Sequence, residues 1–110
     1  SDYRVKENIT NVSDGILEKI NALRPIHYTG KDCGIYKQSS QQRTSFVAHE
    51  LQEQFPDIIR GEKDAVDGDG NAVFQGYKHE DLTSYIIKAV QELSAKLDTM
   101  QTEINNLKQG

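Results

Sequence analysis

The last quarter of the chain carries a strict heptad pattern of apolar residues. The residues of this seam are Ile86, Val90, Leu93, Leu97, Met100, Ile104 and Leu107. They follow one another at alternating steps of four and three, which places Val90, Leu97 and Ile104 at the a positions of a coiled coil and the others at the d positions. At about 1.5 Å per residue the seam is about 33 Å long, and one helix alone has nothing to bury it against.

Self-association is the arrangement that buries such a seam. An apolar helix stripe more often packs against its own domain. This stripe is narrow, however, and only 35% of the residues are hydrophobic, so few apolar side chains remain to cover it. We therefore expect parallel helices from several copies, with Glu103 at a g position beside Lys108 at the next e position of a neighbour. The a and d positions mix β-branched and unbranched residues, so the seam alone does not distinguish a dimer from a trimer.

Composition excludes several other classes of protein. The 110 residues suit one domain, and the net charge of −4 comes with scattered Lys and Arg, which argues against a nucleic-acid-binding surface. Cys33 is the single cysteine, so no internal disulfide is possible. We find no apolar run of membrane-spanning length and no signal peptide, and we expect a soluble module compatible with the cytosol, with no membrane partner.

The patterning predicts an α+β fold, with a small mixed body over residues 1–78 and a long coiled-coil helix over residues 79–110. The first expected elements are an edge strand around Tyr3, Val5 and Ile9 and a helix that is capped by Ser13, stops at Pro25 and carries on one face Ile16, Leu17, Ile20 and Leu23. A strand over 26–29 and a loop over 30–43 follow, and the loop has room for a strand around Ile35 and Tyr36. The last expected elements are a strand over 44–48, a helix over 49–54 closed by Phe55 and Pro56, strands over 57–63 and 72–77, and a helix starting near Glu80 and Asp81.

No metal or cofactor site is expected. Asp67, Asp69 and Asn71 match the first three ligands of a calcium loop, but Ala72 stands where the loop needs glycine and Lys78 where it needs glutamate. We therefore interpret residues 67–71 as a hairpin turn. The three histidines, His27, His49 and His79, have no ligand-like spacing with one another or with Cys33.

Ser1 and Lys6 are a candidate nucleophile and base. A serine hydroxyl attacks well only after a base takes its proton, and a lysine can be that base if burial or a nearby cation such as Arg4 lowers its pKa. On a strand the two side chains would point to opposite faces, and on a helix they would lie about 140° apart. A dyad therefore requires a turn between them or a lysine from another subunit. The separation of Ser1 and Lys6 by five residues is by itself also typical of a solvated strand end with no chemical role.

Four stretches together resemble a known family. They are SDYRVKENI at Ser1–Ile9, ILEKINALRPIHY at Ile16–Tyr28, SFVAHELQEQFPDIIRGEKD at Ser45–Asp64, and YIIKAVQEL at Tyr85–Leu93. In this order they are similar to the self-cleaving intramolecular chaperone domains at the C-termini of bacteriophage tailspikes and tail fibres, the endosialidase-type serine-lysine autoprocessing peptidases. The same processing domain occurs in membrane-tethered myelin regulatory transcription factors. Gly61–Asp64 matches a recurrent motif of the family to which we assign no chemical role.

The resemblance implies a function. Members form homotrimers, guide the folding of the upstream β-rich fibre, and are then cut just before the serine, so Ser1 is the expected nucleophile and Lys6 the expected general base of a single-turnover serine endopeptidase. A chain starting at Ser1 would be the released product. The expected partners are other copies of the chain and the upstream part of its precursor, in the host bacterial cytoplasm during phage assembly, with the fragment absent from the mature virion.

Three alternatives stay open at the level of sequence. The chain would be an inactive trimerisation foot if Ser1 has no chemical role. It would be the processing domain of a membrane-tethered transcription factor if a DNA-binding domain lies upstream. An N-terminal-nucleophile hydrolase, with the Ser1 amine as base, fits least well because the chain is short and lacks long sheet patterns.

Overall fold

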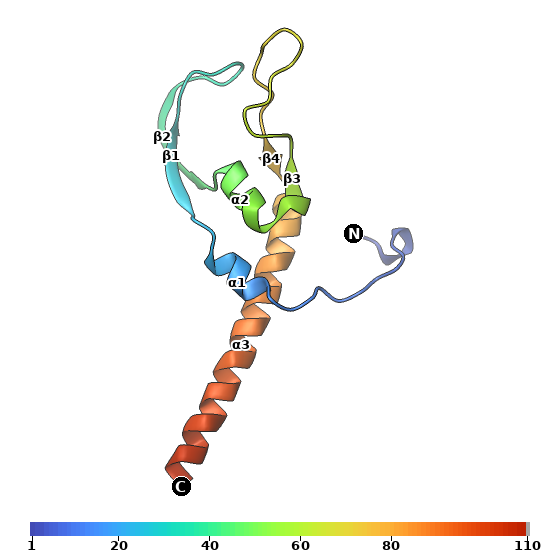
Figure 1. Cartoon of the computed structure of the whole chain (residues 1–110), viewed down its shortest axis with the longest axis vertical. Coiled ribbons are helices and arrows are strands. Elements are labelled where there is room, and N and C mark those ends of the chain that lie inside the picture. Colours follow the sequence, from blue (N-terminus) through green and yellow to red (C-terminus); the bar gives the residue numbers. More distant parts are fainter. Residues whose placement is uncertain (110) are drawn as a thin grey trace.

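The computed structural model describes residues 1–109, in which short elements surround the first turns of a long C-terminal helix (Figure 1). In chain order the elements are the 3₁₀ helix η1 (Tyr3–Val5), α1 (Ile16–Asn21), β1 (Ile26–Gly30), β2 (Ser39–Ser45), α2 (Ala48–Gln54), the 3₁₀ helix η2 (Pro56–Ile58), β3 (Ile59–Arg60), β4 (Gly76–Tyr77) and α3 (His79–Gln109). The fold is thus a mixture of α and β elements, as the patterning predicted. Gly110, the last residue of the expected helix, lies outside the described residues.

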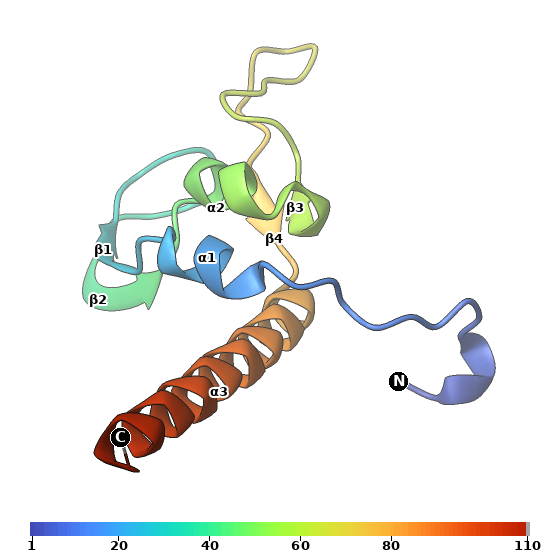
Figure 2. The same ribbon diagram turned by 60° about the horizontal axis from the view of Figure 1, so that its bottom comes forward.

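The molecule is strongly elongated. Its principal extents are 70 × 40 × 22 Å and its radius of gyration is 19.7 Å, whereas a compact chain of about this length has a radius of gyration of about 13 Å. Two segments account for this shape: the C-terminal part of α3 projects below the other elements as a stalk, and residues 1–14, hereafter the arm, extend away from them (Figures 1 and 2). Within residues 1–109, no helix has both the length and the hydrophobicity that crossing a membrane requires.

A small core joins α1, α2 and η2 to the start of α3. Within residues 1–109 its buried side chains are Ile16, Leu51, Phe55, Ile58, Leu82 and Ala89. Leu51 lies in α2 and Phe55 is the C-cap of this helix, four residues later, so both lie on the same face and are fully buried in the core. Pro56 then begins η2, where its missing N–H costs nothing. Phe55 stacks on Tyr85 of α3, with ring centroids 4.6 Å apart.

The β1–β2 hairpin corrects one expectation. Residues 30–43 were predicted to be mainly a loop and 44–48 a strand, but β2 spans Ser39–Ser45 and Ala48 already belongs to α2. The two strands pair antiparallel, with Ile26 opposite Ser45 and a register shift between Tyr28 and Gly30. Both strands are largely exposed. A strand that buries neither face needs no alternation of apolar and polar residues, which is why the pattern did not reveal it.

The tip of this hairpin is a turn. Cys33 and Tyr36 exchange backbone hydrogen bonds of 3.0 and 2.9 Å across Gly34 and Ile35. Gly34 has φ 56°, a conformation that glycine adopts without steric cost. The strand suggested around Ile35 and Tyr36 is therefore wrong.

The β3–β4 hairpin confirms the predicted turn but not the predicted strand lengths. β3 and β4 contain two residues each, with Ile59 opposite Tyr77. Asp57 belongs to η2 instead, and positive φ angles at Gly61 (81°) and Asp64 (62°) end the extended conformation after β3. The turn itself closes with a hydrogen bond of 2.8 Å from Asp67 N to Asn71 O.

Helix α1 begins later and ends earlier than expected. Its N-cap is Gly15, with φ 99°, and not Ser13, and the helix ends at Asn21, before Pro25. Gly15 has no side chain to cap the helix. Instead, the carboxylate of Glu92 on α3 accepts hydrogen bonds from Gly15 N and Leu17 N. The N-terminus of α1 therefore depends on a residue far away in the sequence.

Candidate functional site

A single 3₁₀ turn shapes the start of the arm. The carboxylate of Asp2 accepts hydrogen bonds from Arg4 N at 2.8 Å and from the Arg4 guanidinium at 3.0 and 2.7 Å. The hydrogen bonds from Arg4 hold the pKa of Asp2 below its usual range. An aspartate that bonds to the backbone two residues ahead initiates a turn, so η1 forms here in place of the expected edge strand, which is wrong.

The turn brings Ser1 and Lys6 together. Lys6 N donates to Tyr3 O at 3.1 Å, which closes η1, and Lys6 itself is extended again, with φ −116° and ψ 143°. Its Nζ then lies 2.5 Å from Ser1 Oγ, to which it donates a hydrogen bond. A hydroxyl and an amine at this distance are within reach for proton transfer. The contact is within one chain, and the turn that sequence reasoning required between the two residues is present.

The surroundings of this pair are open. Every residue from 1 to 15 is exposed, so the fold of one chain does not remove water from Lys6. Arg4 was considered as the cation beside Lys6, but its guanidinium is paired with Asp2 at 2.7 Å. Any desolvation of Lys6 must therefore come from outside this chain.

Helix α3 has two apolar stripes that lie side by side. Leu82, Tyr85 and Ala89 face the core. The heptad seam lies on the adjacent face, and each of its seven side chains is between 41% and 81% exposed. The C-terminal part of α3 projects as a stalk away from the other elements (Figure 1). The core therefore covers the first stripe and leaves the whole seam open.

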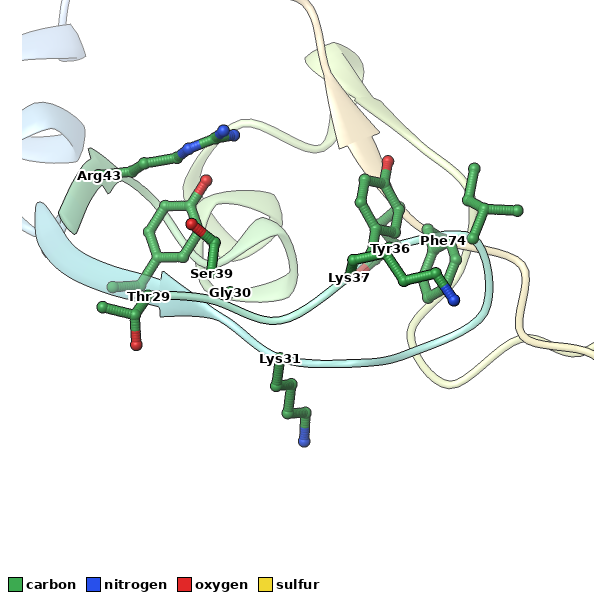
Figure 3. Close-up of a pocket in the computed structure, with 11 residues that line it drawn as sticks. Thr29, Gly30, Lys31, Tyr36, Lys37, Ser39, Arg43 and Phe74 are labelled. Atoms are coloured by element: carbon green, nitrogen blue, oxygen red, sulfur yellow. The ribbon is translucent and has the colours of Figure 1, made fainter. Parts of the chain in front are cut away.

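A groove of about 650 Å³ lies between the β1–β2 hairpin and residues 74–75. Sequence reasoning missed it because its two walls come from distant segments. Its lining combines aromatic and basic side chains, namely Tyr28, Tyr36, Phe74, Lys31, Lys37 and Arg43. Tyr36 and Phe74 meet edge to face at one end, with centroids 5.1 Å apart, while Ser39 and Arg43 lie at the other end (Figure 3).

Three residues that the sequence offered as metal ligands, namely Asp67, His27 and His79, have other partners. The carboxylate of Asp67 accepts hydrogen bonds from Asn71 N (3.0 Å) and Asp69 N (2.9 Å), which lower its pKa and stabilise the turn. His27 hydrogen-bonds Thr44 Oγ1 at 2.8 Å, and the ring of His79 lies 4.4 Å from that of Tyr77. Across residues 1–109, no group of three or more His, Cys, Asp or Glu residues is placed to hold a metal ion.

Comparison with known proteins gives one match. A family model of peptidases described as "chaperone of endosialidase" matches residues 1–60. These are more than half of the 110 residues, and they include the arm, α1, the β1–β2 hairpin, α2 and η2. No curated protein matches the chain.

Proposed function

We propose a function from the premise that this chain belongs to the peptidase family described as chaperone of endosialidase. The chain is the C-terminal intramolecular chaperone of a longer phage tail-fibre or tailspike precursor. It associates as a homotrimer, guides the folding of the upstream β-rich segment, and releases itself by cutting the peptide bond before Ser1. The observation that carries the proposal is the 2.5 Å contact between Lys6 Nζ and Ser1 Oγ.

The chemistry follows from that contact. Lys6, in its neutral form, takes the proton of the Ser1 hydroxyl, and Ser1 Oγ attacks the carbonyl carbon of the preceding residue. The C–N bond to Ser1 breaks, and the proton passes from Lys6 to the departing Ser1 nitrogen, leaving an ester on Oγ. Water then hydrolyses the ester, which frees a carboxylic acid and restores the hydroxyl. Each chain cuts once, so the protein is a single-turnover peptidase acting on itself.

Association would supply what one chain lacks. A lysine acts as a base only when it is neutral, and desolvation favours the neutral form. Lys6 is exposed in one chain, so neighbouring chains or the upstream fibre would have to cover it. The open heptad seam of α3 supports a parallel association of chains, and the resemblance to self-cleaving chaperone domains implies that three chains take part. Cutting would therefore follow assembly, and unfolded precursor would stay intact.

The chaperone role follows from the same tether. Three chains joined by the seam hold their upstream segments at high effective concentration and in a common register. Fibres with many non-local pairings gain most from this, because such pairings otherwise nucleate slowly. We place this assembly in the host bacterial cytoplasm, with other copies of the chain and its own upstream segment as partners, and the released fragment absent from the mature virion.

The decisive experiment uses a precursor with its native upstream residues. The wild type should yield a new N-terminus at Ser1, read by protein sequencing, whereas Ser1→Ala should give an uncut trimer. Ser13→Ala, at another exposed serine of the arm, is the matched control and should be cut normally. Normal cutting of Ser1→Ala would refute the mechanism, and a wild-type trimer that stays full-length would indicate a passive trimerisation foot.

A further inference from the structure

One side chain of α3 holds the junction between the arm and α1. Glu92 Oε1 accepts a hydrogen bond from Gly15 N at 2.6 Å, and its Oε2 accepts one from Leu17 N at 2.7 Å. Both carboxylate oxygens are therefore used, and bonds to an ionised acceptor are roughly twice as strong as neutral ones. We call this arrangement of Glu92 with the two amides the Glu92 latch. It joins segments more than seventy residues apart.

The base of the arm has further contacts with α3. Lys88, one turn before Glu92, pairs with Asp14 at 2.9 Å. Asn11 and Val12 share a shallow hollow with residues of α3, among them Ser84 and Lys88. Val12 is 43% exposed, whereas Tyr3 and Val5 near the tip are 77% and 82% exposed. The arm is thus attached at its base and free at its tip.

The latch lies next to the seam. Glu92 directly precedes Leu93 and follows Val90 by two residues. Val90 and Leu93 both belong to the heptad seam. Packing of these seam residues against neighbouring helices would fix the rotation of α3 at Glu92. The direction in which the arm leaves α3 would then be set relative to the axis of the assembly.

We propose that Glu92 is a positioning residue for self-cleavage, whose carboxylate orients the arm so that the Ser1–Lys6 pair reaches its cutting position only when α3 is folded and associated. The inference rests on the proposed function and deepens it. Glu92 does not touch the reacting atoms; it acts through the backbone at Gly15 and Leu17.

The geometry requires a glutamate. α1 has only six residues, and the first amides of a helix have no partner within it. A glutamine would offer one acceptor oxygen and would turn its own N–H₂ toward the second amide. An aspartate is one methylene shorter, so its carboxylate would not reach the two amides from the same backbone position. The hydrogen bond from Gly15 N lowers the pKa of Glu92, and the bond from Leu17 N and the charge of Lys88 act in the same direction. Burial and the charge of Asp14 raise it, and the net shift is downward.

The test measures cutting by Glu92→Gln in the full precursor. We expect a trimer by analytical ultracentrifugation, a cleavage rate at least tenfold below wild type, and faster hydrogen exchange at the amides of Gly15 and Leu17. Asp98→Asn makes the same charge change on an exposed part of α3 and should be cut at the wild-type rate. Ile20→Val loosens the packing of α1 without touching the latch, and it should also be cut at the wild-type rate.

Three outcomes decide the matter. Glu92→Gln trimers cut at the wild-type rate would overturn the inference, and so would equal slowing by Ile20→Val at a matched melting temperature. If Glu92→Gln fails to assemble, Glu92→Asp becomes the test, since it keeps the charge of Glu92 but not its reach to Gly15 N and Leu17 N; slower cutting supports the inference and an unchanged rate overturns it. Ser1→Ala in the same assay tests the proposed function separately. Normal cutting of Ser1→Ala would refute the proposed function, whereas an uncut Ser1→Ala beside a normally cut Glu92→Gln would refute only the role of Glu92.

Discussion

Ser1 and Lys6 meet because of a third residue, Asp2. Its carboxylate binds both the backbone and the guanidinium of Arg4, and the chain turns once before it extends again at Lys6. Exposed ion pairs contribute little stability, so we regard Asp2 and Arg4 as shaping the turn and not as holding the arm rigid. The spacing of five residues between hydroxyl and amine is useful only with this turn between them.

At this scale the first prediction concerns Lys6. Lys6→Ala in the precursor should slow self-cleavage about a hundredfold or more, because positioned general bases contribute about 10²–10⁴-fold. Lys31→Ala removes another exposed lysine and should leave the rate unchanged. Wild-type cutting should also fade as the pH falls, because a protonated amine accepts no proton. Rates from gel densitometry would test both points, and an unchanged rate for Lys6→Ala would mean that another base operates.

Tyr85 gives a second prediction at the residue scale. Its hydroxyl donates to Asp57 Oδ2 at 2.6 Å, and this hydrogen bond, with burial, raises the pKa of Tyr85 to about 12. The folded state therefore favours the neutral phenol. The resulting stabilisation is complete below the ordinary tyrosine pKa of about 10 and is lost as the pH rises through about 12.

An alkaline titration followed by ultraviolet absorbance would measure this shift. Of the five tyrosines, one should titrate late, near pH 12, and Tyr85→Phe should remove that phase. Tyr28→Phe, at a 41% exposed tyrosine, should leave the late phase in place. Five tyrosines that titrate together near the ordinary value of about 10 would contradict the prediction.

At the scale of elements, α3 has two apolar stripes with different surroundings. One stripe completes the core through Leu82, Tyr85 and Ala89, and the adjacent seam stays exposed in one chain. α1, in contrast, depends on others: it has six residues, its N-cap has no side chain, and its first amides bind Glu92. Short helices are marginal in isolation, so α1 forms because α3 is already there.

The start of α1 gives the third prediction. Gly15→Ala should destabilise the protein by about 1–2 kcal/mol, because φ 99° is unfavourable for any residue with a Cβ. Gly68→Ala is the control, since a Cβ there also meets nothing within 4 Å but the backbone is not left-handed. It should change stability little. Urea denaturation of both variants would test the contrast, and equal losses would show that φ at Gly15 is not the cause.

The seam gives the fourth prediction. Leu97→Asp should give monomers at micromolar concentration, because burying an unpaired charge between helices costs on the order of several kcal/mol. Thr99→Asp introduces the same charge two residues away, on the outer face of α3, and should stay associated. Sedimentation analysis of both variants would decide. A Leu97→Asp protein that still associates would exclude the seam as the interface.

At the scale of the whole molecule, one chain buries only a small core. The core within residues 1–109 has six side chains, while large apolar residues stay exposed along the arm and α3. Small cores supply little net stability. The radius of gyration of 19.7 Å is likewise larger than the value of about 13 Å for a compact chain of this length.

The fifth prediction follows from this shape. If folding is coupled to association, the melting temperature should rise with protein concentration. Each tenfold step in protein concentration changes the association free energy by up to about 1.4 kcal/mol. A change of 1 kcal/mol moves the melting temperature of a domain of this size by about 4–8 °C. We therefore expect a rise of up to about 10–20 °C over a hundredfold range of protein concentration in circular-dichroism melts. A constant melting temperature would indicate a chain that folds alone.

Local signals in the amino-acid sequence were sufficient for the long helix with its heptad seam, for the stop at Phe55 and Pro56, and for the turn at residues 67–71, because neighbouring residues alone produce each of them. The turn at η1 was also local, and Asp2 two residues before Arg4 was the overlooked signal. Tertiary contacts decided the rest. β2 is a strand because β1 pairs with it, and α1 begins at Ile16 because Glu92, far along the chain, binds its first amides. No local pattern encodes such long-range hydrogen bonds, since they form only after the chain has folded back on itself.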